Sequence, residues 1–210
     1  MTNLFIREYR NQLTPEFCNR VISRFESSGL SSPGKISDSM GNRIVDTNVK
    51  QSLDLHLSKY PKEWEYEDVV FFQSLNNCLK DYNEYLSSIN ICPGVVSYTG
   101  NIDKVFSDTG YQIQKTVPGG FYDWHNDFLV DQLGVRYLTY IWYLNSNFEG
   151  GNTEFICGTE IVPEIGKLII FPATWTNYHR GQPVIEGEKY VVAGCIHVKD
   201  ILSNKNVKIP

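Results

Sequence analysis

The spacing of hydrophobic residues changes about halfway along the chain. Apolar residues recur at helical spacing in the first half, whereas short apolar or alternating runs separated by turn residues follow after about residue 92. A stripe with a period of 3.6 residues is typical of an amphipathic helix, and short runs bounded by glycine are typical of strands. The pattern therefore predicts helices first and a β-rich region after them.

Two helices are predicted in the first half. Thr14-Pro15-Glu16 supplies an N-cap followed by proline at the first helical position, and Gly29 ends this first helix. The second helix is expected over about 67–87. Its apolar stripe consists of Val69, Phe72, Leu75, Leu79, Tyr82 and Leu86. The segment 36–61 between the two helices has no clear period and is left mostly unassigned.

Short strands are predicted in the second half. Their apolar runs are Gly94–Tyr98, Tyr111–Val117, Arg136–Leu144, Thr153–Ile156, Lys167–Phe171, Pro183–Ile185 and Lys189–Val198. Glycine turns separate these runs, at 118–120, 150–151, 157–158 and 186–187. Many short strands preceded by helices predict a mainly β fold with flanking helices (α+β), in which a β-sandwich or jelly roll carries helices on one face. We expect one domain over 1–210, mainly helical over 1–91 and with its β core at 92–198.

Composition and charge narrow the function classes. The net charge of −5, with Lys and Arg scattered along the sequence and no local basic patch, argues against a nucleic-acid partner. Five widely spaced cysteines without a CxxC pair indicate neither a disulfide framework nor a zinc site. No signal peptide or membrane-spanning run is found, so a soluble protein in the cytoplasm or another reducing compartment is expected.

His125 and Asp127 form a His-x-Asp pair that suits a metal site. On a strand, residues i and i+2 project from the same face, so both side chains reach one ion. The third ligand has two candidates among the four histidines of the chain. His197 lies in an apolar run where a core histidine is the simpler interpretation, so we favour His179, at a strand end before a turn. Two histidines and one carboxylate leave open positions on the metal, as iron(II) oxygenases require.

After His179 the chain continues with Gly181-x-Pro183-Val184-Ile185, and a basic residue, Lys189, follows ten positions after the histidine. With this pattern the segment 179–198 resembles the C-terminal half of prolyl 4-hydroxylases, which belong to the iron(II)/2-oxoglutarate dioxygenase superfamily. Arg136-x-x-Thr139-x-x-x-Tyr143-Leu144 and Glu149-Gly150-Gly151-x-Thr153 also resemble the central strand and glycine turn of that family. The resemblance covers roughly 111–198 and implies a double-stranded β-helix (jelly roll, cupin-like) core.

The resemblance also implies roles for individual residues. Iron(II) is bound by His125, Asp127 and His179, and Lys189 pairs with the distal carboxylate of 2-oxoglutarate. The hydroxyl of Tyr143 contacts the same carboxylate, although a core tyrosine is an equally good interpretation of that residue, and Thr139 lines the cosubstrate pocket. Substrate contacts are assigned to Arg136, Tyr122, Trp175 and Cys195. The implied cofactors are Fe(II), 2-oxoglutarate and O2, with ascorbate as an accessory reductant.

The function implied is hydroxylation of a proline-containing peptide or protein at C4 of proline, with release of succinate and CO2. The chain departs from the family at Cys195, where tryptophan is usual, and at Lys115-Thr116, where tyrosine is usual. Both departures keep open the same chemistry on another peptidyl residue or on a small molecule. A non-catalytic jelly-roll binding module is the alternative from another class. The polar segments 35–50 and 101–110 are expected to be loops near the substrate.

Overall fold

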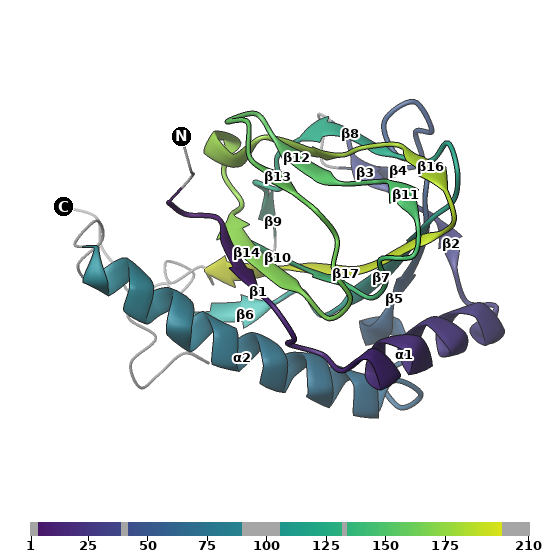
Figure 1. Cartoon of the computed structure of the whole chain (residues 1–210), viewed down its shortest axis with the longest axis horizontal. Helices are drawn as coiled ribbons and strands as arrows, with labels where there is room; N and C mark the ends of the chain where they lie inside the picture. The colour runs from purple at the N-terminus through teal and green to yellow at the C-terminus, as the bar shows by residue number, and fades with distance from the viewer. Residues whose placement is uncertain (1–3, 39–41, 90–105, 132–133, 199–210) are drawn as a thin grey trace.

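A large antiparallel sheet forms the base of the fold in the computed structural model, which describes residues 4–38, 42–89, 106–131 and 134–198 (Figure 1). Within these ranges the sheet has nine strands. The main path runs β1 (Arg7–Tyr9), β14 (Leu168–Pro172), β10 (Gly134–Tyr143), β17 (Lys189–Val198), β7 (Gln112–Thr116), β5 (Leu53–His56) and β2 (Ser32–Pro33). Two further strands, β6 (Phe106–Asp108) and β9 (Val130–Asp131), pair with β17 and β10.

A smaller sheet faces the large one. Its order is β13 (Glu160–Ile161), β12 (Thr153–Phe155), β15 (His179–Gly181) and β8 (Tyr122–His125). Two strand pairs complete the β structure: β11 (Glu149–Gly150) with β16 (Val184–Glu186), and β3 (Ile36–Ser37) with β4 (Arg43–Ile44). The two facing sheets form the jelly roll that the sequence pattern predicts, and the fold class is confirmed by the likeness to solved structures of this architecture.

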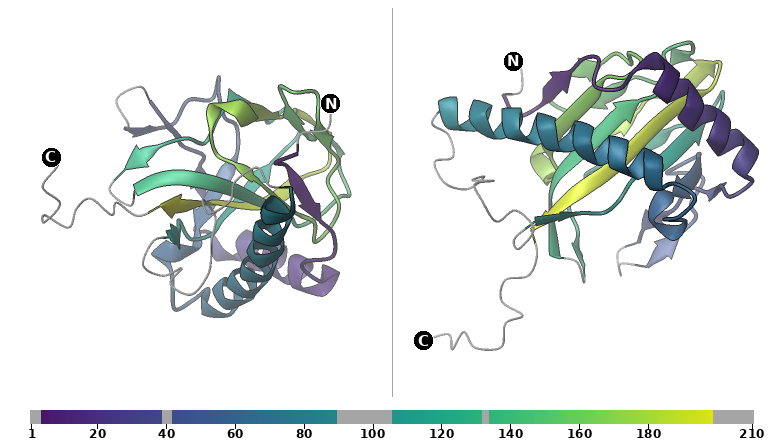
Figure 2. Two further views of the ribbon diagram at one scale, coloured as in Figure 1. Left: turned by 90° about the vertical axis from the view of Figure 1, so that its left-hand side faces the viewer. Right: turned by 90° about the horizontal axis from the view of Figure 1, so that it is seen from below.

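The two predicted helices are present and cover one face of the large sheet (Figure 2). The first, α1 (Pro15–Ser28), begins where the Thr14 hydroxyl accepts a hydrogen bond from the Phe17 amide over 3.2 Å, and it ends at Gly29 in the left-handed conformation. The second, α2 (Glu65–Ser88), is slightly longer than predicted. Short 3-10 turns lie at η1 (Leu57–Lys59) and η2 (Trp175–Asn177). None of the helices in the described ranges is long and apolar enough to cross a membrane.

Alternation along β10 divides the side chains between two environments. Tyr140 and Trp142 are fully buried against the helices, and the Trp142 ring lies 5.3 Å from the ring of Phe71 on α2. Thr139 and Ile141 instead line a cavity between the two sheets. Because side chains alternate along a strand, one face of β10 packs into the core and the other face lines the cavity.

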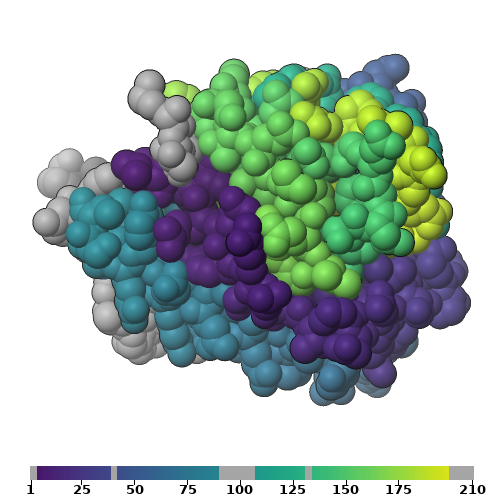
Figure 3. All heavy atoms as spheres, viewed as in Figure 1, coloured from purple at the N-terminus to yellow at the C-terminus, as the bar shows by residue number. Residues whose placement is uncertain are grey.

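The first 91 residues also supply strands, which the prediction of a mainly helical segment missed. β2 and β5 extend one edge of the large sheet, and β1 adds the other edge by pairing with β14. Figure 3 shows the N-terminal segment lying along the surface between α2 and the β-rich part. These strands have two to four residues, too few for a period to be read from the sequence. The run predicted at 94–98 lies outside the described residues.

A buried carboxylate joins the two helices. Glu67 on α2 is fully buried and accepts hydrogen bonds from Arg20 and Arg24 on α1, with oxygen–nitrogen distances of 3.0 and 2.6 Å. A buried charge is tolerated only when it is paired and hydrogen-bonded, so this pairing fixes how α1 docks on α2.

Candidate active site

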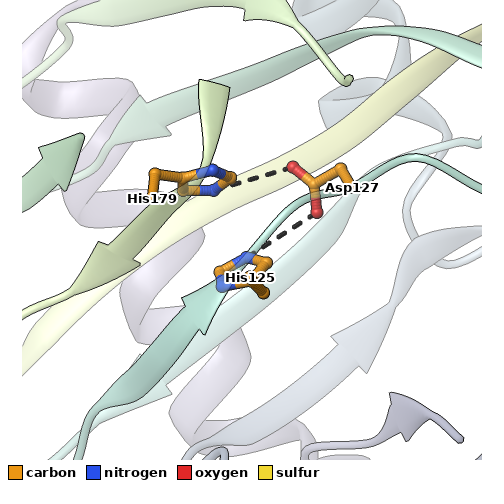
Figure 4. Close-up of side chains that lie close together, drawn as sticks. All are labelled: His125, Asp127 and His179. Atoms are coloured by element: carbon orange, nitrogen blue, oxygen red, sulfur yellow. Dashed lines mark ion pairs between the residues drawn. The ribbon is translucent and has the colours of Figure 1, made fainter. Parts of the chain in front are cut away.

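Three potential metal ligands converge at the edge of the smaller sheet. His125 ends β8, His179 begins β15, and the two strands pair with these residues opposite each other. Asp127 faces both imidazoles (Figure 4). Its Oδ1 atom lies 3.7 Å from Nε2 of His125, and its Oδ2 atom lies 3.7 Å from Nε2 of His179. One ligand atom from each residue falls within 4.8 Å of the others. The structure thus brings His179, and not His197, to the His-x-Asp pair.

Asp127 is not on the strand, contrary to the sequence prediction. β8 ends at His125, and Asp127 lies in the segment that follows. Its amide donates a hydrogen bond of 3.2 Å to the Ala173 carbonyl after β14, and its Oδ2 atom accepts one of 2.8 Å from the Thr139 hydroxyl. Contacts from the large sheet, rather than strand alternation, therefore place this carboxylate.

Backbone carbonyls orient both imidazole rings. Nδ1 of His125 lies 2.7 Å from the Asp123 carbonyl, and Nδ1 of His179 lies 2.9 Å from the Asn177 carbonyl. Because a carbonyl only accepts, Nδ1 carries the proton in each ring and Nε2 keeps its lone pair. The Nε2 lone pair of each ring is therefore available to a metal. Histidine ligands are commonly oriented in this way, by a hydrogen bond from the ring nitrogen that does not bind the metal.

The electrostatics of His125 and Asp127 also suit a cation. Burial lowers the pKa of His125, and neighbouring His179 lowers it further. Burial opposes ionisation of Asp127, but the two histidines and the Thr139 hydroxyl outweigh it and hold its pKa below the ordinary value. Neutral imidazoles and an ionised carboxylate are the forms that bind metals, so the residues fit a divalent ion.

A cavity of about 610 Å³ opens beside these residues and extends between the two sheets. Lys189 lies in its wall with only 7% of its surface exposed, and its Nζ donates a 2.6 Å hydrogen bond to the Gly151 carbonyl. No carboxylate among the described residues pairs with it. Burial lowers its pKa to about 8. A buried ammonium with a single backbone partner is suited to an anionic ligand.

The other predicted site residues divide into two groups. Thr139, Arg136, Tyr122 and Cys195 line the cavity, and the Tyr122 ring stacks on His125 with 3.6 Å between centroids.

Two predicted residues are absent from the cavity wall. Trp175 is 75% exposed and belongs to η2. Tyr143 is fully buried behind Thr153, to whose hydroxyl it donates a 2.6 Å hydrogen bond. Thr153, in the glycine-turn motif, lines the cavity, and the centroid of the Tyr143 ring lies 5.8 Å from Nζ of Lys189. The predicted contact of Tyr143 with the cosubstrate stays a prediction.

The cavity is strongly basic, which corrects the prediction of scattered charges without a basic patch. Within the described residues one carboxylate, Asp127, lines it together with six basic residues. These are Lys35, Arg43, Lys50, Lys59, Arg136 and Lys189. Four of the six lie within residues 35–59, and Arg136 and Lys189 come from distant strands, so their convergence on one cavity is visible only in the folded chain.

Comparisons with known proteins identify the architecture. Residues 111–197 match the family model described as the 2OG-Fe(II) oxygenase superfamily. A viral collagen prolyl hydroxylase from Paramecium Bursaria Chlorella virus-1, solved as a 2OG complex, is similar with a TM-score of 0.61 and 21% identity, covering 91% of this chain and 95% of that one.

Two further prolyl hydroxylases share the fold. The Trichoplax adhaerens protein, solved with a hypoxia inducible factor peptide fragment, gives a TM-score of 0.68 at 15% identity and covers 98% of this chain and 89% of that one. A Pseudomonas putida prolyl-4-hydroxylase gives 0.60 at 16% identity, covering 91% and 92%. No curated protein sequence matches the chain significantly.

Proposed function

We propose that His125, Asp127 and His179 hold the iron of a 2-oxoglutarate-dependent dioxygenase, because residues 111–197 match the family model of the 2OG-Fe(II) oxygenase superfamily. The observation that carries the proposal is the convergence of their three ligand atoms within 4.8 Å, beside a cavity whose wall holds a buried ammonium with no carboxylate partner among the described residues. Bound iron and 2-oxoglutarate supply oxygen activation, with release of succinate and CO2. The complete ligand set argues against the non-catalytic binding module.

Lys189 would bind the distal carboxylate of 2-oxoglutarate. Burial deprives the Lys189 ammonium of its hydration. A charge-assisted hydrogen bond to the carboxylate would offset the free energy that this desolvation costs. The Thr153 hydroxyl lies in the same wall, and its bond to Tyr143 holds it in place. Ile141 and Val191 contribute apolar surface nearby, which limits water around the bound cosubstrate.

The proposed substrate is a peptidyl proline, hydroxylated at C4. The likeness in fold to three prolyl hydroxylases supports this choice, and Tyr122 and Arg136 line the cavity where a peptide would lie. Cys195 occupies the wall where tryptophan is usual in the family, and its smaller side chain leaves more room. That observation favours a second candidate, in which another peptidyl residue or a small molecule is oxidised. Ascorbate would sustain turnover by keeping the iron ferrous.

The test is anaerobic titration of the full-length protein with iron(II) and then 2-oxoglutarate, followed by visible absorption. The parent should develop the metal-to-ligand charge-transfer band of the ternary complex. His179→Ala should abolish the band, and Lys189→Met should require much more 2-oxoglutarate to reach it. A parent protein that binds iron(II) no better than His179→Ala would contradict the proposal.

A further inference from the structure

The basic residues of the cavity are more numerous than a single cosubstrate requires. If Lys189 takes the distal carboxylate of 2-oxoglutarate, five other Lys and Arg residues remain on the cavity wall. Among these five, Lys50 is neutralised by Asp54, with 2.8 Å between Nζ and Oδ2. Lys35, Arg43, Lys59 and Arg136 form no ion pair within the described part of the chain.

Two of these cations stand together on the strand pair β3–β4. Lys35 immediately precedes β3, and Arg43 begins β4. The Arg43 guanidinium donates hydrogen bonds to the Lys35 carbonyl over 3.2 Å and to the Ser37 hydroxyl over 3.5 Å, and the residue is exposed at the cavity. Like charges side by side repel each other unless an anion binds between them, and no described carboxylate fills that role.

A third cation reaches the same cavity from the large sheet. Arg136 on β10 is half-buried, and its Nε atom is buried without a hydrogen-bond partner. An unsatisfied buried donor costs free energy that a ligand oxygen would recover. Lys59 contributes less, because its neighbour Ser58 also lines a second cavity, which holds the acidic residues Glu65, Asp68 and Asp108.

We propose that the outer cavity binds an acidic peptide segment, whose carboxylates contact Lys35, Arg43 and Arg136 beside the residue to be oxidised. The inference rests on the proposed function for the use of Lys189 and for the peptide nature of the substrate. The amide side chain of Gln114 on the same wall offers further hydrogen bonds to a peptide, whereas the Gln112 amide already donates to Asp54.

A peptide suits the charge distribution better than a nucleic acid does. The chain as a whole carries a net charge of −5, so a polyanion that extends beyond the cavity meets repulsion from the rest of the surface. A short acidic segment instead places its charges only where the cations lie.

Calorimetric titration of the full chain, with iron(II) and 2-oxoglutarate under anaerobic conditions, tests the inference. Three synthetic peptides share a central proline and differ only in flanking Asp, Asn or Lys residues, and an oligothymidylate of similar length serves as a fourth probe. We expect the Asp peptide to bind at least about tenfold more tightly than the Asn peptide, and its affinity to fall with added salt. The Lys peptide should bind weakest.

Charge reversal locates the contact. Arg43→Glu should weaken the Asp peptide by about tenfold and leave the Asn peptide unchanged, whereas Lys80→Glu, an exposed lysine on α2, should change neither by more than about twofold. Equal binding of Asp and Asn peptides to the parent, equal effects of the two substitutions, or tighter binding of the oligothymidylate would each overturn the inference. The iron–2-oxoglutarate band in the same samples reports separately on the proposed function.

Discussion

The Thr139 hydroxyl donates a 2.8 Å hydrogen bond to Oδ2 of Asp127, and this bond joins the large sheet to the carboxylate of the candidate metal centre. Because Asp127 lies beyond the end of β8, no strand pairing fixes its side chain. Thr139 is therefore a positioning residue, which acts on the metal through Asp127.

Removal of this hydroxyl should weaken metal binding. We expect Thr139→Val, which keeps the shape of the side chain, to lower iron(II) affinity by about tenfold, as measured by competition with a chelator. Thr139→Ser keeps the hydroxyl and should restore most of the affinity. Equal affinities for Thr139→Val and the parent would show that the carboxylate is held by other contacts.

2-Oxoglutarate binding should depend on pH through Lys189. The pKa of this ammonium is about 8 in the ligand-free protein, and only the protonated form binds a carboxylate well. Affinity should be constant below that pH and fall about tenfold per pH unit above it. Lys189→Arg keeps its charge throughout this range, so its affinity should stay flat. A parallel fall in both proteins would assign the titration to another group.

The same lysine should destabilise the ligand-free protein. Its folded pKa of about 8 is depressed, so above that value the unfolded chain binds more protons, and stability should rise with pH up to the unfolded pKa of roughly 10.4. Lys189→Met removes the buried charge but leaves the Gly151 carbonyl unpaired, for a net gain of about 1 kcal/mol in unfolding free energy at pH 7. Urea denaturation measures this change. A less stable Lys189→Met protein, or no rise with pH in the parent, would contradict the expectation.

Gly151 should tolerate no side chain. Its φ is +64°, and a Cβ would lie 3.1 Å from Val184 and 3.2 Å from Cδ of Lys189. Gly29 has the same φ and no atom within 4 Å of its Cβ position, which makes Gly29→Ala a matched control for backbone strain alone. We expect about 1 kcal/mol of destabilisation for Gly29→Ala and at least about twice that for Gly151→Ala. Only Gly151→Ala should also weaken 2-oxoglutarate binding. Equal losses of unfolding free energy in the two variants would mean that the neighbouring side chains, Lys189 included, move aside without cost.

The buried ion pair between the helices should dominate their docking. Glu67→Gln removes the buried charge but keeps an acceptor, and Arg20 and Arg24 remain partly exposed, so we expect a loss of about 2 kcal/mol in unfolding free energy. Arg10→Ala removes an exposed ion pair with Glu164 and should cost less than about 1 kcal/mol. Denaturant titration of both variants makes the comparison, and similar costs would show that Glu67 is not the main link.

The sequence by itself determined the elements that have strong local causes. The Thr14 cap, the Gly29 stop and the apolar stripe of the second helix act within a few residues, so both helices were predicted correctly. The candidate ligands His125, Asp127 and His179 were proposed from their spacing and from an ordered set of motifs, and the structure places their ligand atoms within 4.8 Å of one another.

The tertiary structure decided what depends on residues far apart in the chain. The short edge strands β1, β2 and β5 form because partners in the large sheet supply their hydrogen bonds, and two to four residues carry no period. The hydrogen bond between Tyr143 and Thr153 at the cavity joins residues of two different sheets, so it exists only in the folded chain. The Lys and Arg residues of the cavity wall come together only in the folded chain. The positive electrostatic potential of the cavity therefore depends on the tertiary structure.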